Sequence, residues 1–240
     1  GNYIIPFLQV IEKPIVVTLH SVLSLKDKRC EQRNLYLKKI VNSIAEKSSA
    51  LVVMNKLSQE ILEREYGIPG SKIFLIPHGI PQTSFEPSEK FKTLYDLEGK
   101  TVLSTFGLLS PNKGVEYAIR ALPEIVKKYP DVIYLVLGVT HPAIRAQNGE
   151  AYRTFLMREA EQLGLKNNVK FYNKYLTLEE VVNYLKATDI YISPAIDPEQ
   201  SVSGTLSYAL GCGRPAIATE SIYAKYIISE ENGILVKQKD

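Results

Sequence analysis

Three short segments of small and cationic residues each follow a run of apolar residues. They are segments 107–114, 138–141 and 201–205. Lys113 supplies a positive charge in the first segment. Residues 203–206 are expected to open a helix, whose first amide N–H groups have no partner within the helix. A cation and free amides together suit a diphosphate, although none of the segments is a Walker loop or a GxGxxG sequence.

Each segment also has a plain structural explanation. A glycine after a strand usually serves only the turn, and Gly138 is equally open to that explanation. Lys113 could likewise be a solvated lysine of a turn. The case for binding depends on the segments converging in space. In open α/β sheets, ligands bind at the carboxyl ends of the strands, and all three segments are expected to lie there.

Short β-branched runs alternate with stretches of helical period, which predicts parallel strands joined by crossover helices and an α/β fold class. Strands are expected at 14–19, 50–54, 72–76, 101–107, 132–137, 169–172, 190–193 and 216–218, with a strand-like run at 233–236. Helices are expected at 56–66 after an Asn55 cap, at 115–128, near 150–163, after a capping box at Thr177 and Glu180, and up to Gly211. Pro123 predicts a kink near Leu122.

The best candidate for a linker between two lobes is the stretch 81–100. It contains Pro81, Pro87 and several charges but few β-branched residues. The predicted organisation is therefore a first lobe, a linker and a second lobe, at 1–85, 86–100 and 101–240.

The composition fits a globular protein, with 45% apolar and 23% charged residues among 240. The net charge of +3 comes from scattered lysines, so no nucleic-acid-binding arm is expected. Cys30 and Cys212 lie far apart and predict neither a disulfide framework nor a zinc site. No run approaches the roughly 18 apolar residues that span a bilayer, and no leader sequence is recognisable. These features predict a soluble protein of the reducing cytoplasm.

The order of strands over residues 98–240, the Gly-x-x-x-x-x-Lys-Gly segment 107–114 and the run from Ser203 to Pro215 resemble family 4 of the retaining glycosyltransferases. Residues 1–85 are similar to part of that family's first lobe, above all at Thr18-Leu19-His20 and Ile76-Pro77-His78-Gly79. The resemblance implies the GT-B fold, with two Rossmann-like parallel-sheet lobes. It also implies a chain truncated at both ends, whose incomplete first lobe has exposed edges or apolar faces.

The resemblance assigns roles to residues of this sequence. Lys113 would act as the catalytic cation that neutralises the donor diphosphate. The amides of Ser203, Gly204 and Thr205 would hold the sugar and phosphate. His20 matches a catalytic histidine that reaches towards the transferred sugar, although an imidazole that only satisfies a backbone carbonyl is the alternative.

Roles are also expected for two glycines and two histidines. Gly107 and Gly138 would lie in the donor-binding site. His141 would either touch the nucleotide or cap its loop together with Pro142. For His78 a structural role is favoured.

The sequence departs from the family pattern at three positions. The family has two glutamates separated by seven residues, where this chain has Gln200 and Tyr208. Both are counted as donor-binding residues, and Glu199 joins them because a one-residue shift of the loop would supply a carboxylate. Leu108 stands where many relatives carry a second phosphate-binding arginine. These departures predict that the donor is recognised differently from the family pattern.

The predicted function is that of a retaining glycosyltransferase that moves a hexose from a nucleotide-diphosphate sugar to a carbohydrate or lipid-linked acceptor. As the anomeric bond breaks, charge builds on the leaving diphosphate, and preorganised cations and amides stabilise it. No metal and no further cofactor is expected. The predicted partners are the nucleotide sugar and the acceptor, through which peripheral membrane contact would arise. The alternative is a degenerate relative that binds a nucleotide sugar or a partner without turnover, which Gln200 and Tyr208 favour. An epimerising or phosphorolytic GT-B relative has no signature here.

Overall fold

The computed structural model describes residues 3–26 and 31–239. The chain forms two compact units, residues 1–78 with 199–202 and residues 79–198 with 203–240. The stretch 79–100, which the sequence divides between the first lobe and the linker, therefore groups with the second unit.

The first unit is built on a three-stranded parallel sheet in the order β1-β2-β3. Its strands are β1 (Val16–Thr18), β2 (Ala50–Val53) and β3 (Ile73–Leu75), and its helices are α1 (Ile4–Gln9), α2 (Glu31–Lys47) and α3 (Lys56–Ile61), the last continued by a π-helical turn at Leu62–Tyr66. Asn55 is the N-cap of α3, because its side chain accepts a hydrogen bond from the Ser58 N–H at 2.8 Å. The buried core includes Leu51 and Leu62, whereas Val16 and Phe74 are exposed.

The second unit contains a six-stranded parallel sheet in the order β6-β5-β4-β7-β8-β9. The strands are β4 (Thr101–Phe106), β5 (Val132–Leu137), β6 (Val169–Tyr172), β7 (Ile190–Ser193), β8 (Ala216–Thr219) and β9 (Gly233–Val236). Numbered from β4, this is the 3-2-1-4-5-6 order of a doubly wound dinucleotide-binding fold, and the order reverses between β4 and β7.

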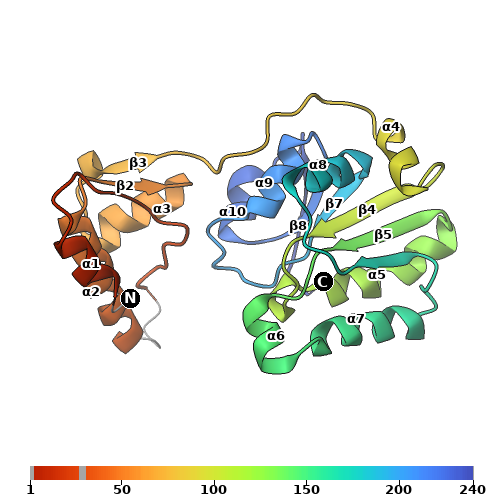
Figure 1. The fold of residues 1–240 in the computed structure, drawn as a ribbon, viewed down its shortest axis with the longest axis horizontal. Coiled ribbons are helices and arrows are strands. Elements are labelled where there is room, and N and C mark those ends of the chain that lie inside the picture. The colour runs from red at the N-terminus through yellow and green to blue at the C-terminus, as the bar shows by residue number, and fades with distance from the viewer. Residues whose placement is uncertain (1–2, 27–30, 240) are drawn as a thin grey trace. The chain divides into compact units, whose positions relative to one another are not determined.

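Helices cover both faces of this sheet (Figure 1). They are α4 (Glu89–Lys92), α5 (Val115–Lys128), α6 (Pro142–Asn148), α7 (Ala151–Gln162), α8 (Leu178–Ala187), α9 (Gly204–Gly211) and α10 (Ile222–Ile227). On one face, Ile119 of α5 and Leu156 of α7 pack in a core with Val136 of β5. On the opposite face, Tyr184 of α8 packs with Leu135. Alternate residues of β5 thus enter opposite cores, which is why its whole length is buried.

The predicted helix at 115–128 is present over those residues and continues through Pro123 without interruption. The predicted capping box is also present: the Thr177 hydroxyl accepts from the Glu180 N–H at 3.2 Å, and the Glu180 carboxylate accepts from the Thr177 N–H at 2.8 Å. The short helices α1, α4, α6 and α10 are additional to the elements expected from the sequence.

A buried polar cluster attaches the stretch 79–100 to the rest of the second unit. Arg214 is only 5% exposed, and its Nη2 donates to the Glu86 carbonyl oxygen at 2.6 Å. Lys92 Nζ lies 2.8 Å from a carboxylate oxygen of Asp189. The arginine of the Gly-Cys-Gly-Arg-Pro run therefore serves the architecture of this unit.

Candidate functional site

The strand order of the second unit reverses between β4 and β7, and the carboxyl ends of the strands beside such a point are where open α/β sheets bind ligands. The loop after β4 carries Gly114, whose φ of 62° lies in the left-handed region. A Cβ added to Gly114 would lie 2.2 Å from the carbonyl oxygen of Pro194, which directly follows β7. The Ile196 N–H donates to the Asn112 carbonyl at 3.0 Å. The two loops are thus in backbone contact at the switch point.

The loops after β4 and β5 also pair through their backbones. A Cβ on Gly138 would lie 2.1 Å from the carbonyl oxygen of Gly107, so only glycine fits there. The Leu109 N–H donates to the Val139 carbonyl at 2.9 Å, and the His141 N–H donates to the Leu109 carbonyl at 2.8 Å. The first two predicted segments therefore lie side by side.

The third segment joins them at the beginning of α9. A Cβ on Gly107 would meet the methyl group of Thr205 at 3.2 Å. Ser203 caps the helix, since its Oγ accepts from the Leu206 N–H at 3.4 Å. Gly204 and Thr205 lie in the first turn of α9, where backbone N–H groups have no acceptor within the helix. Residues 203–205 of the third segment thus meet the first two segments at one edge of the sheet of the second unit.

Lys113 ends a 3-10 turn, Pro111–Lys113, and is half-buried. Burial lowers the pKa of Lys113, because desolvation disfavours the ammonium form. Among residues 3–26 and 31–239, no carboxylate lies within ion-pair distance of its amine. A desolvated cation without a counter-charge would be stabilised by an incoming anion.

Buried hydroxyl groups beneath the site were not anticipated from the sequence. Thr105 of β4 bonds the Tyr134 phenol at 2.7 Å and donates to the Ile192 carbonyl of β7 at 2.6 Å. Tyr191 is bonded by the Thr205 side chain, and burial raises its pKa to about 12. These bonds connect β4, β5, β7 and the first turn of α9. Their only sequence signal is a polar residue within a strand, which does not reveal the partner.

Two further predicted residues lie in this unit. His141 is exposed, and its Nδ1 accepts from the Ala143 N–H at 3.2 Å, so it caps α6. Contact with the nucleotide and capping of the loop both stay predictions for His141. Tyr208 of α9 is half-buried, and its ring centroid lies 6.2 Å from that of Phe106.

The remaining predicted residues belong to the first unit. His20 is exposed and follows closely after β1. Glu199 and Gln200 lie in the segment 199–202, which groups with the first unit by its contacts. Within that unit the Asn55 side chain donates to the Ser201 carbonyl at 2.5 Å.

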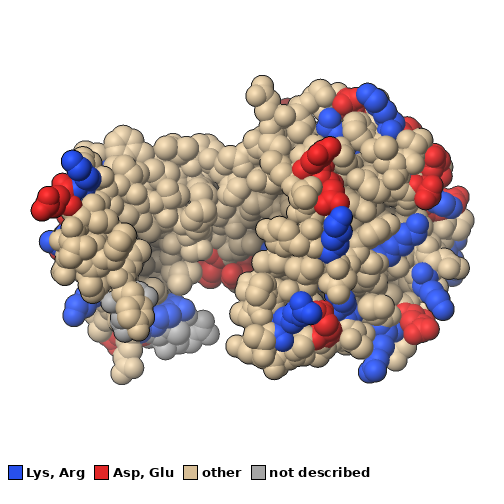
Figure 2. Space-filling view, in the orientation of Figure 1, with Lys and Arg blue, Asp and Glu red and all other residues tan. Residues whose placement is uncertain are grey.

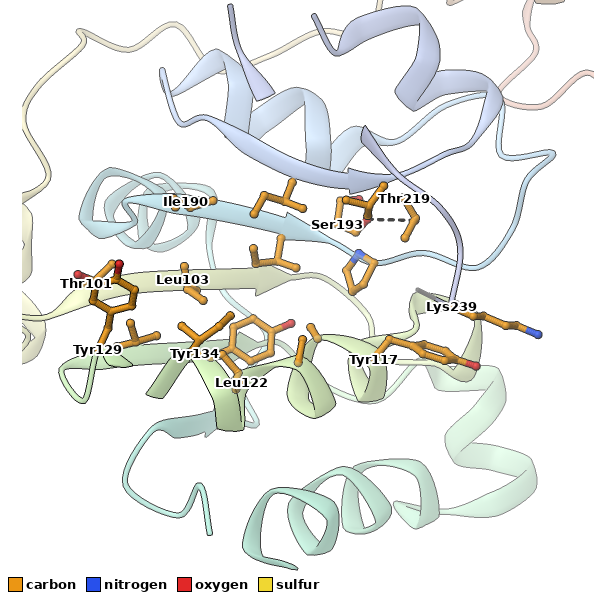
Figure 3. A pocket seen from close by; sticks show the side chains of 18 of the residues that line it. Thr101, Leu103, Tyr117, Leu122, Tyr129, Tyr134, Ile190, Ser193, Thr219 and Lys239 are labelled. Carbon is orange, nitrogen blue, oxygen red and sulfur yellow. Dashed lines mark hydrogen bonds between the residues drawn. The ribbon is translucent and has the colours of Figure 1, made fainter. Parts of the chain in front are cut away.

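A separate cavity of about 540 Å³ lies beside α5 in the second unit (Figure 3). Its wall is largely apolar and includes Leu122, Ile190, Ile192 and Ile217. None of the predicted site residues lines it. It is therefore distinct from the edge where the three segments meet.

The described parts of the chain show no metal site and no membrane-spanning helix. Residues 3–26 and 31–239 contain no group of three or more histidine, cysteine or acidic side chains placed to hold a metal ion. In the same ranges, no helix has the length and apolar character that a membrane crossing requires. On the face shown in Figure 2, positive and negative side chains are interspersed over the second unit.

Residues 87–240 match the sequence family described as glycosyl transferases group 1. The chain therefore belongs to this family, which confirms the resemblance found in its sequence.

Curated relatives carry related names. The phosphatidyl-myo-inositol mannosyltransferase of Mycobacterium tuberculosis is 28% identical over 218 residues, which cover 89% of this chain and 50% of the relative. The D-inositol 3-phosphate glycosyltransferase of Segniliparus rotundus is 22% identical over 231 residues, or 93% of this chain and 49% of the relative. The chain thus spans about half the length of the curated relatives it matches.

Solved structures share the fold. HepE from Anabaena, crystallised with UDP, superposes with a TM-score of 0.74 at 24% identity and covers 94% of this chain and 59% of its own. Sucrose-phosphate synthase from Thermosynechococcus elongatus gives a TM-score of 0.75 at 21% identity, with 98% and 57% covered. Together with the parallel sheets, these neighbours confirm the predicted GT-B α/β fold class.

Proposed function

We propose that this chain is part of a retaining glycosyltransferase that moves a hexose from a nucleotide-diphosphate sugar to a carbohydrate or lipid-linked acceptor. The observation that carries the proposal is Lys113, a half-buried ammonium without a carboxylate partner among the described residues. It lies in the loop after β4, which contacts both the loop after β7 and the first turn of α9. Membership of the glycosyl transferases group 1 family supports the same reaction class.

In this proposal the chain stabilises the leaving group. Negative charge grows on the nucleoside diphosphate as the anomeric bond breaks. Lys113 and the free amides of Gly204 and Thr205 offer positive potential there without further rearrangement. The proposal gives charge neutralisation to these groups rather than to a metal ion, and it keeps His20 as the residue directed to the transferred sugar.

The names of relatives suggest which substrates to test. A Corynebacterium glutamicum relative is named as a GDP-mannose-dependent phosphatidylinositol monomannoside mannosyltransferase, whereas HepE was crystallised with UDP. Both GDP- and UDP-sugars are therefore candidate donors, and inositol-containing lipids are candidate acceptors. A cytoplasmic location with peripheral membrane contact through such an acceptor belongs to the same proposal.

The test is a calorimetric titration of the chain with GDP-mannose, UDP-glucose and ADP-glucose. We expect saturable binding of one donor that Lys113→Ala weakens roughly 10- to 150-fold, because a charge-assisted hydrogen bond contributes about 1.5–3 kcal/mol. Lys127→Ala is the matched control, since Lys127 is an exposed lysine at the other end of the following helix, α5. Equal binding by wild type and Lys113→Ala would remove Lys113 from the site.

A second candidate function is donor binding without turnover. It is favoured by Gln200 and Tyr208, which stand where the family pattern has glutamates, and the Tyr208 ring lies near that of Phe106. Incubation with the bound donor and an inositol acceptor separates the two functions. Transfer or donor hydrolysis that Lys113→Ala abolishes supports the enzyme. Tight binding with no product supports the binder.

A further inference from the structure

Arg153 on α7 is almost completely buried, with 5% of its surface exposed. Its Nη2 donates to the carbonyl oxygen of Gly138 at 2.5 Å. Gly138 is the first residue of the turn 138–141 between β5 and α6. A side chain from α7, the second helix after this turn, therefore reaches back to the residue that packs against Gly107.

Glu150 holds the same turn at a second point. Its carboxylate accepts a hydrogen bond from the Thr140 hydroxyl, and this bond is the largest cause of its lowered pKa. The other oxygen lies 3.2 Å from Arg145 Nε, and Arg153 Nε lies 3.4 Å from Glu150 Oε2. Arg153 and Glu150 thus form an ion pair that bonds both Gly138 and Thr140.

Burying the Arg153 guanidinium in this way lowers the stability of the fold. Within residues 3–26 and 31–239, Nη1 of Arg153 is buried without a hydrogen-bond partner, and the buried Nε has the 3.4 Å ion pair with Glu150 Oε2 in place of a short hydrogen bond. Burial is also the main cause of the lowered pKa of Arg153. Most buried polar atoms in folded proteins are hydrogen-bonded, and an unsatisfied one destabilises the fold. A buried guanidinium with so few hydrogen bonds indicates that the conformation of the turn 138–141 matters for function.

The turn 138–141 lies at the edge of the sheet where the ligand is proposed to bind. It is bonded to Leu109 in the loop after β4, and it follows the second strand of the dinucleotide-binding order. In folds of this order, ligands bind at the carboxyl ends of the strands beside the point where the strand order reverses. Adjacent strands are about 4.8 Å apart, so the turn is one strand spacing from the loop that carries Lys113.

We propose that Arg153 and Glu150 are positioning residues that hold the turn 138–141, and through it the loop that carries Lys113, in the form that binds the donor nucleotide. They act through the backbone of Gly138 and the side chain of Thr140 and do not touch the ligand. This inference rests on the proposed function for its ligand, but the positioning itself can be measured without one.

The first measurement is amide hydrogen exchange in the ligand-free protein. We expect Arg153→Met to speed exchange about tenfold or more in the segment 138–141 and to leave β5 protected. Arg153→Lys keeps the charge but cannot donate like the guanidinium fork to both Gly138 and Glu150, so it should show a smaller effect in the same segment. Unchanged exchange at 138–141 in both variants overturns the positioning role.

Arg214→Met is the matched control. Arg214 is also 5% exposed and also donates to backbone carbonyls, but it anchors the stretch 79–100 instead of the turn. It should lower the melting temperature and leave exchange at 138–141 unchanged. If Arg214→Met loosens the turn as much as Arg153→Met does, the effect is a general loss of stability and the proposal fails.

The second measurement is binding of UDP and GDP by calorimetry. Arg153→Met should weaken the nucleotide that the wild type binds by about tenfold, and Glu150→Gln should weaken it less, because an amide oxygen still accepts from Thr140. Arg214→Met should bind as the wild type does. Equal affinity in Arg153→Met and the wild type overturns the role of the pair in nucleotide binding. A folded wild type that binds no nucleotide instead overturns the proposed function, and the exchange experiment still decides the positioning role.

Discussion

Gly138→Ala tests whether backbone contact between the loops after β4 and β5 shapes the site. The φ of Gly138 is 125°, and an added Cβ would lie 2.1 Å from the Gly107 carbonyl oxygen. The Gly107 carbonyl oxygen is a backbone atom directly after β4, so it cannot rotate away as a side chain would. The unfavourable backbone angle costs about 1–3 kcal/mol and overpacking about 1–3 kcal/mol more. We therefore expect the free energy of unfolding to fall by roughly 2–6 kcal/mol.

Two other glycines separate these contributions. Gly149 has a φ of 59° and nothing within 4 Å of an added Cβ, so Gly149→Ala should show only the smaller backbone cost. Gly107 has a φ of 126° and would meet only the Thr205 methyl group at 3.2 Å, so Gly107→Ala should be intermediate.

The assay is urea denaturation followed by circular dichroism, with the midpoint and the slope both fitted. The expected order of destabilisation is Gly138→Ala, then Gly107→Ala, then Gly149→Ala. Gly138→Ala should also weaken nucleotide binding in the fraction that stays folded. If Gly138→Ala is as stable as Gly149→Ala, the loops after β4 and β5 do not approach as described, and the site geometry is wrong.

Three further predictions follow from particular contacts. Because an anion stabilises the charged form of Lys113, donor affinity should fall as pH rises towards the ordinary lysine value of 10.5, and this fall should be absent in Lys113→Ala. Titration in buffers of different ionisation enthalpy should show proton uptake on binding at alkaline pH. Arg214→Met should lower the free energy of unfolding by about 1.5–3 kcal/mol, measured in urea, because buried carbonyl oxygens lose a charged donor. Thr177→Ala removes the cap of α8 and should cost about 1 kcal/mol without changing nucleotide affinity.

The strands of the second unit were predictable because each is a short apolar run between turn residues. The runs at 132–137, 169–172 and 190–193 agree with the structure residue for residue. The helices α6 and α10 were not predicted, because six or seven residues carry too little periodicity. Their beginnings depend on side-chain caps from His141 and Ser221, which many loops could offer.

The convergence of the three segments was predictable from topology, since the carboxyl ends of parallel strands share one edge. The positioning pair was not, although both residues are visible in the sequence. In the sequence, Arg153 looks like an ordinary charged residue of a helix, and Glu150 looks like one at the start of that helix. Their role depends on the carbonyl of Gly138 and the hydroxyl of Thr140, which come close only after β5, α6 and α7 have folded together.

The departure at Leu108 changes how the site must work. With leucine where the resemblance implies a second arginine, Lys113 is the sole cationic side chain of the loop 107–114. In the proposed donor site, the rest of the positive potential would then come from backbone dipoles, above all the N–H groups that open α9, and these act only at fixed positions. Fixed positions in turn require the close approach of Gly107 to Thr205 and of Gly138 to Gly107. A site with fewer mobile charges thus depends more on exact packing, which is the condition that the buried Arg153 helps to maintain.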